Sequence, residues 1–167
     1  MRRSVVLTVG LVLAVGLAAG IAYTQANLPN AGWLKGTTDQ KFAILANLQP
    51  GMGTVMMEYG TRFTNAYYAA KGGNFELAVY MIEEMKEIQE VGENTRPGRA
   101  AALKGFEAAF LDKLEAAAKA KNWSQYQAIV PQAITACNGC HVASKPEHPY
   151  ITYVLPTGPV APLKMTK

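Results

Sequence analysis

Residues that bind metals or form disulfides are scarce in this chain. Its 167 residues include two cysteines and two histidines. A structural zinc site needs four ligands, and beyond Cys137, Cys140 and His141 the sequence offers only His148 as a good fourth. This shortage disfavours a zinc site at the cysteine pair.

Patterns typical of β-strands are missing as well. A thioredoxin-like redox pair of cysteines needs a βαβ context, which this sequence lacks. A plain structural disulfide is compatible with an exported protein, but it does not account for the histidine directly after the second cysteine. No acid–base pair or nucleophile accompanies the cysteines, so we do not expect an enzyme.

Clusters of basic residues are also absent, which counts against nucleic acid as a partner. Once Arg2 and Arg3 are set aside from the 16 lysines and arginines, 14 scattered basic residues remain against 12 acidic ones. We interpret the one acidic cluster as a solvated helix face, with a docking surface for a basic partner as the alternative: Glu83, Glu84, Glu87, Glu90 and Glu93.

The N-terminus has the layout of an export signal. Arg2 and Arg3 precede residues 5–22, which contain no charged residue. We predict that residues 1–26 are a signal peptide, with cleavage after Ala26. An uncleaved membrane anchor is the alternative, because the apolar run is close to the length of a spanning helix. In both cases the remaining chain is exported, and we expect it in the periplasm.

Four helix-length segments make up most of the remaining chain. Residues 27–50 are predicted to be a linker with one short helical piece at about 39–48. In the segments that follow, apolar residues recur at steps of three and four. We expect Asn74 and Ser124 to act as N-caps and Pro131 to kink the last segment. The four helices are expected at about residues 53–71, 74–94, 99–121 and 124–145.

Short breaks between these helices predict an all-α fold, an up-down-up-down antiparallel four-helix bundle over residues 51–145. The prolines of residues 146–167 predict an extended tail along the surface. In such a bundle the start of the first helix, the end of the second, the start of the third and the end of the fourth meet at one end.

The residues CNGCH, Cys137 to His141, match the attachment signature of c-type haem. Two thiols on adjacent turns can add across the two vinyl groups of one porphyrin edge, and the following histidine reaches the iron. Attachment of this kind takes place outside the cytoplasm, in agreement with the export signal. We expect one covalent haem c, held by Cys137 and Cys140, with His141 as the proximal iron ligand.

A second iron ligand should come from the same end of the bundle. Met56 lies within a turn of the start of the first helix, on its apolar stripe, and we predict it as the distal ligand; core packing is the alternative. Met81 and Met85 lie two turns or more deeper along the second helix, and we interpret them as core filler.

Three further polar residues are candidates near this end. Arg96 and Arg99 fall in the loop between the second and third helices, where they can pair with haem propionates. His148 lies just beyond the last helix. We interpret it as a helix-end cap, with a propionate contact or ligation in trans as alternatives.

Together these features resemble the class II cytochromes c, the group of cytochrome c′ and its low-spin relatives. More narrowly, the chain from Met56 onward is similar to a family of small exported cytochrome c′-like proteins. The resemblance covers about two thirds of the chain, and CNGCH is the part of it that is specific for haem. The other shared elements are Met56 and Arg62, six residues apart, GGNFELAVY (Gly72 to Tyr80) and HPYITYVLP (His148 to Pro156).

The resemblance implies a role for Met56, because a methionine of the first helix is the sixth iron ligand in low-spin members. In cytochrome c′ proper an apolar side chain blocks that position, and the five-coordinate iron binds nitric oxide or carbon monoxide. This chain departs from that pattern by offering methionine. Its longer, proline-rich tail is a second departure, and it bears on how far the haem is exposed to solvent.

We therefore expect a monohaem electron carrier with His/Met ligation, which reacts with redox partner proteins that the sequence does not identify and which can form a homodimer. One alternative is a five-coordinate haem protein that binds nitric oxide or carbon monoxide. Another is a haem subunit of a membrane electron-transfer complex, in which residues 1–26 remain as the anchor; contact with the membrane is expected only in that case.

Overall fold

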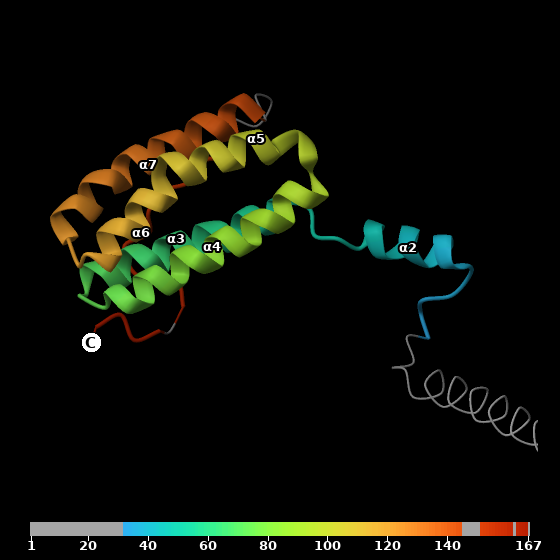
Figure 1. Cartoon of the computed structure of the whole chain (residues 1–167), viewed down its shortest axis with the longest axis horizontal. Helices are drawn as coiled ribbons and strands as arrows, with labels where there is room; N and C mark the ends of the chain where they lie inside the picture. Colours follow the sequence, from blue (N-terminus) through green and yellow to red (C-terminus); the bar gives the residue numbers. More distant parts are fainter. Residues whose placement is uncertain (1–31, 145–150, 162, 167) are drawn as a thin grey trace, which may run out of the picture. The chain divides into compact units, whose positions relative to one another are not determined.

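The computed structural model describes residues 32–144, 151–161 and 163–166. These residues form helices joined by short turns, and no β-strand occurs among them (Figure 1). The predicted all-α class is therefore confirmed. In the same part of the chain, every helix is too short or too polar to cross a membrane. The predicted signal segment, residues 1–26, lies outside the described residues, as does His148.

The chain divides into two compact units, Met1–Leu48 and Gln49–Lys167. The described element of the first unit is α2, Thr38–Asn47, which confirms the helical piece predicted at 39–48. The hydroxyl of Thr37 accepts a hydrogen bond from the Gln40 backbone, and the Gln40 side chain accepts one from the Thr37 backbone, which is a capping box. No residue of α2 is buried.

The second unit holds the remaining helices. Turns of three residues or fewer separate them at 72–74, 96 and 120–122. Asn74 caps α4 as predicted, because its side chain accepts a hydrogen bond from the Leu77 backbone. The helices are α3 (Met52–Lys71), α4 (Phe75–Thr95), α5 (Pro97–Phe106), η1 (Glu107–Leu111), α6 (Asp112–Lys119) and α7 (Trp123–Ser144).

The predicted cap of the last helix is wrong by two residues. Helix α7 begins at Trp123, so Ser124 lies inside it. The side chain of Asn122 accepts a hydrogen bond from the Gln125 backbone at 3.0 Å and takes the capping role. Both residues are good caps by type, and the tight turn at Lys121, with φ of 53°, decides where the helix starts. The helix continues across Pro131.

The third predicted helix, 99–121, is interrupted by one wide turn. Residues Glu107–Leu111 form a π-helical turn between α5 and α6, in which the Asp112 backbone donates to the carbonyl of Glu107, five residues earlier. Such a turn inserts one extra residue and shifts the helix face. Here Phe106 packs against the core while its neighbour Glu107 reaches Gln89 of α4. A regular pattern of apolar residues gave no sign of this insertion.

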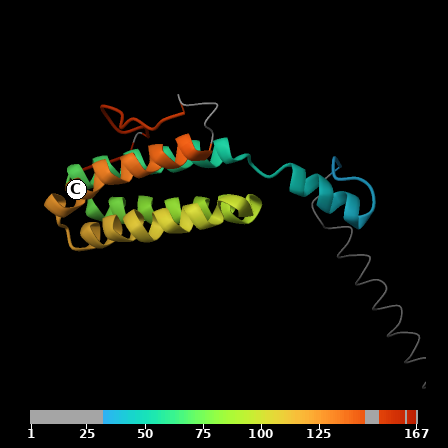
Figure 2. The ribbon, with the colours of Figure 1, turned by 90° about the horizontal axis from the view of Figure 1, so that it is seen from above.

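The core lies between α3, α4, the α5–η1–α6 segment and α7. Helices that follow each other in the chain pack against each other, and α7 also packs against α3 (Figure 2). The core contains large side chains from four helices: Phe63 from α3, Ile82 and Met85 from α4, Leu114 from α6 and Tyr126 from α7. This packing fixes the C-terminal half of α7 beside the N-terminal half of α3.

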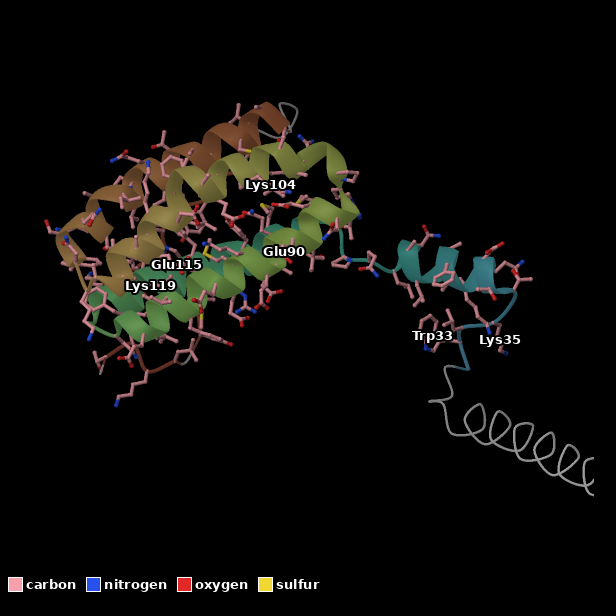
Figure 3. All side chains as sticks on the ribbon, in the orientation of Figure 1. Trp33, Lys35, Glu90, Lys104, Glu115 and Lys119 are labelled. Carbon is pink, nitrogen blue, oxygen red and sulfur yellow. The ribbon has the colours of Figure 1, made fainter. Side chains whose placement is uncertain are left out.

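The acidic cluster of α4 is only partly the solvated face that was predicted. Glu83, Glu87 and Glu90 are exposed, but Glu84 pairs with Arg62 of α3 at 2.9 Å. The side chain of Glu93 is 11% exposed, and it accepts a hydrogen bond from Gln89 and faces Lys104. Figure 3 labels Glu90 and Lys104, together with Glu115 and Lys119 on α6. Ion pairs across helix boundaries therefore account for part of this charge.

The described residues of the tail, 151–161 and 163–166, contain no helix and lie against α3 and α7 (Figure 2). Two backbone amides of the tail, at Val160 and Ala161, donate to the side-chain oxygen of Asn65. Two later side chains, on α3 and at the cap of α4, also contact the tail: Tyr68 donates to the carbonyl of Pro156, and Asn74 donates to that of Lys164. Side chains of α3 thus hold the backbone of the tail at several points.

Candidate functional site

Helix α7 carries the two cysteines and the histidine of the CNGCH motif on one face. Cys137 and Cys140 are three residues apart and Cys137 and His141 are four apart, so the side chains share one helix face. All three are partly buried, and both cysteines are free thiols. The helix therefore presents two thiols and one imidazole side by side toward the interior of the unit.

A cavity lies on this face of α7. Its empty space amounts to about 590 Å³ when the part that is open to solvent is counted. Most of its walls are apolar, and it is lined by Met56, Tyr59, Gly60, Phe63, Ala102, Leu103, Phe106, Cys137, Cys140, His141 and Tyr153.

Met56 lines the same cavity as the motif. It lies near the start of α3 and is partly buried against the core. Its neighbour Met57 points away and is 75% exposed. Met81 and Met85 are buried in the core and do not line the cavity, in agreement with their interpretation as core filler. The structure thus brings Met56, alone among these methionines, together with Cys137, Cys140 and His141.

One ring nitrogen of His141 lacks a partner. Its Nδ1 atom is buried and makes no hydrogen bond to the described residues. An unpaired buried polar atom costs about 1–3 kcal/mol, so native structures usually supply a partner. A metal-bound histidine gives one nitrogen to the metal and the other to a second partner. This histidine therefore suits a site that is completed by a group from outside the chain.

The thiol of Cys137 lies in an environment that keeps it protonated. Burial, with a smaller effect of Cys140, raises the pKa of the Cys137 thiol to about 12. A thiol with so high a pKa is a poor nucleophile and a poor ligand for a free metal ion at neutral pH. Among the described residues, no three His, Cys, Asp or Glu side chains are grouped to hold a metal ion. These features disfavour a zinc site at the cysteine pair.

A buried polar network supports one wall of the cavity. Tyr59 lines the cavity with its ring and donates its hydroxyl to the Gln89 side chain at 3.1 Å. The Gln89 amide donates to Glu107 at 2.7 Å and to Glu93 at 2.9 Å. Burial, followed by the nearby charges, raises the pKa of Tyr59 well above its ordinary value, so the phenol remains a neutral donor. The hydrogen bond to Gln89 thereby fixes the Tyr59 ring at the cavity wall.

The two arginines predicted to pair with propionates do not line the cavity. Arg99 donates to the side chain and the backbone carbonyl of Ser144, at 2.8 and 3.2 Å. It thereby caps the last turn of α7, one turn after His141. Arg96 donates to the carbonyls of Thr95 and Pro50. The structure assigns both arginines contacts at helix ends, and their pairing with propionates stays a prediction.

Sequence reasoning missed Tyr153, a tail residue that lines the cavity. Its ring meets Phe63 edge to face at 5.5 Å, and its hydroxyl is 2.7 Å from that of Thr64. The tail shows a weak signal for this placement, because Tyr153 and Leu155 are partly buried while the residue between them is exposed. That alternation is too short to predict a partner.

Comparison with known proteins found no relative of this chain. No family model matches the chain, and no match was found among the curated proteins or the solved structures. The interpretation of the site therefore depends on its own chemistry: two thiols and a histidine on one helix face, a thioether facing the same apolar cavity, and an unpaired imidazole nitrogen. These residues fit a covalently attached haem.

Proposed function

We propose that this protein is an exported monohaem c-type cytochrome that carries electrons. Cys137 and Cys140 would hold the haem through thioether bonds, and His141 and Met56 would ligate the iron. The observation that carries the proposal is the shared cavity: the CNGCH motif and Met56, about 80 residues apart in the chain, line one apolar space. The helical unit would be the up-down-up-down four-helix bundle of the class II cytochromes c.

The residues around the cavity suit this role. When bound, haem c supplies an iron that accepts and releases one electron. Two fixed ligands, His141 and Met56, keep the coordination the same in both oxidation states and favour a high potential. Phe63, Leu103 and Phe106 give the cavity an apolar lining, which favours a high potential of a bound haem. Arg99 holds the end of the helix that carries the motif.

The proposal includes a location and partners. The N-terminal signal would direct the protein to the periplasm, where c-type haem is attached, and its partners would be redox proteins. A homodimer is a further part of the proposal, and an anchored form that retains residues 1–26 is its alternative. Mass analysis of the mature protein tests the anchored form, because loss of residues 1–26 removes the anchor.

Covalent attachment is the first test. The full chain, expressed with a haem-attachment system in the periplasm, should retain haem on a denaturing gel, and the pyridine derivative should show one haem per chain. Replacement of both cysteines, Cys137→Ala with Cys140→Ala, should abolish this signal because no thioether remains. A wild-type protein without covalent haem would overturn the proposal.

The second test concerns Met56 and has a matched control in its neighbour. The ferric protein should show a methionine-to-iron charge-transfer band, which Met56→Ala removes. Met57→Ala should leave the band unchanged, since Met57 is exposed and does not line the cavity. A high-spin wild-type spectrum with tight binding of carbon monoxide would instead favour the five-coordinate alternative.

A further inference from the structure

The tail is attached to the haem motif itself. Asn138, one of the two residues between the cysteines, forms two hydrogen bonds with the backbone of Tyr153. Its side-chain oxygen accepts from the Tyr153 amide at 2.6 Å, and its side-chain amide donates to the Tyr153 carbonyl at 3.0 Å. An asparagine side chain thus pairs with one tail residue as a backbone strand would.

The side chain of Tyr153 is fixed at its far end as well. Its hydroxyl meets that of Thr64, which is buried on α3 and itself donates to the Gly60 carbonyl. The Tyr153 ring lies over Gly60, where an added Cβ would make ordinary van der Waals contact with the ring carbons at 3.5 Å. With its backbone held by α7 and its hydroxyl held by α3, Tyr153 bridges the two helices that carry the motif and Met56.

The rest of the tail is anchored beyond the cavity. Asn65, which is 2% exposed, uses its side-chain oxygen for two tail amides, and Tyr68 and Asn74 add further contacts. Because a buried oxygen of Asn65 accepts from two tail amides, tail docking is part of the folded state. These tail residues, 151–161 and 163–166, are called the strap, and they are held both at the cavity and along α3.

We propose that the strap controls access to the haem site through Tyr153, and that Asn138 is the positioning residue that holds Tyr153 in place. This inference rests on the proposed function. Tyr153 and Met56 both line the cavity, so displacement of Tyr153 would admit water and small ligands to the haem site. Tyr153 thereby sets how fast an external ligand replaces Met56 and helps to maintain a high reduction potential.

The test compares the two residues between the cysteines. Asn138→Ala removes both hydrogen bonds to Tyr153 and leaves Cys137, Cys140 and His141 unchanged. Gly139→Ala is the matched control, because Gly139 is exposed and a Cβ there meets nothing within 4 Å. Two readouts are used on the full-length holoprotein: hydrogen exchange of the Tyr153 amide, and the rate at which imidazole binds the ferric haem.

Asn138→Ala should accelerate both amide exchange and imidazole binding about tenfold, because two hydrogen bonds shift the open population by about that factor. Gly139→Ala should change neither. Tyr153→Ala should also speed imidazole binding and lower the potential, while Tyr153→Phe, which keeps the ring, should retain most of the wild-type behaviour. This pair covers the case in which Asn138→Ala fails to fold.

Two negative outcomes can be told apart. If the wild-type protein binds no covalent haem, the proposed function fails and this inference fails with it. If the haem is present and Asn138→Ala speeds exchange at Tyr153 without altering imidazole binding or the potential, only the inference is overturned. The strap would then be a structural element.

Discussion

At the scale of single residues, three buried polar side chains organise the second unit. Gln89, Asn65 and Thr64 are each at most 2% exposed, and each has hydrogen-bond partners on another segment. Leaving such groups unpaired is costly, so each one specifies which segments must meet. Gln89 joins α4 to α3 and η1, whereas Asn65 and Thr64 join α3 to the strap.

The contact of Gln89 with Tyr59 can be measured directly. Gln89→Leu should lower the free energy of unfolding by about 1–3 kcal/mol, because the Tyr59 hydroxyl loses its buried acceptor. Tyr59→Phe should cost about 0.5–1.5 kcal/mol. Denaturant unfolding of both variants and the double variant measures the coupling. If the two losses simply add, the hydrogen bond at 3.1 Å does not contribute to stability.

Gly72 and Gly73 are adjacent but are required for different reasons. Gly72 has φ of −81°, which any residue adopts, yet a Cβ there would lie 2.5 Å from the Met165 carbonyl oxygen. Gly73 has φ of +81°, and a Cβ there meets nothing within 4 Å. One glycine therefore makes room for the strap, and the other permits the turn.

Alanine at each position should separate these roles. Gly72→Ala should release the end of the strap and speed tryptic cleavage at Lys164 while leaving helix stability nearly unchanged. Gly73→Ala should cost about 1–2 kcal/mol of unfolding free energy through backbone strain and leave cleavage at Lys164 near the wild-type rate. Equal cleavage of both variants would contradict this assignment.

At the scale of helices, the ends of α7 illustrate how capping is decided. Asn122→Ala should lower the free energy of unfolding by about 0.5–2 kcal/mol, because the Gln125 amide loses its acceptor. Ser124→Ala should have almost no effect, since Ser124 is exposed inside the helix. Thermal unfolding of the two variants measures the difference, and the reverse order of effects would restore Ser124 as the cap.

An ion-pair network joins α4 to α6. Lys86 lies 2.7 Å from Asp112 and 2.6 Å from Glu115, and Lys119 also pairs with Glu115 (Figure 3). Burial alone would raise the pKa of Glu115, but hydrogen bonds from Lys119 and Lys86 outweigh it and hold the pKa below its usual 4.5. The folded state therefore favours the ionised carboxylate.

The network should make stability depend on acid pH. Because the pKa of Glu115 is lowered on folding, its contribution is present above about pH 4.5 and is lost as the pH falls through the lower, folded value. Lys86→Met should thus destabilise the protein at pH 7 by less than about 1 kcal/mol, because Asp112 and Lys119 of the network are exposed to solvent. The deficit should shrink by pH 3. Lys113→Met, at an exposed lysine of α6 without an ion pair to the described residues, is the control.

At the scale of the whole molecule, the second unit contains the entire described core. Every buried residue of the described chain lies at or after Val55, and α2 contributes none. A chain of residues 49–167 behind a cleavable export signal should therefore fold with a melting temperature within about 2 °C of the full protein, since such a shift corresponds to only a few tenths of a kcal/mol. A larger drop would show that residues 1–48 stabilise the fold.

Much of the helical part could be predicted because its signals are local. The periodicity of three and four, Gly72-Gly73 and Asn74 located α3 and α4 to within about two residues. The wide turn at Glu107–Leu111 and the cap at Asn122 escaped prediction, because the apolar stripe and the residue types are equally compatible with the regular alternative.

The features of the candidate site also separate into those with a local sequence signal and those that depend on tertiary packing. The sequence by itself determined the all-α class, the approximate helices and the CNGCH motif, since each depends on residues within a few turns of one another. Tertiary packing alone decided which side chains share the cavity with the motif. Met56 reaches it although Cys137 is far away in the chain, Arg96 and Arg99 do not, and Tyr153 arrives from the tail. Contacts such as Thr64 with Tyr153, 89 residues apart, exist only because buried polar groups must find partners once the helices have packed.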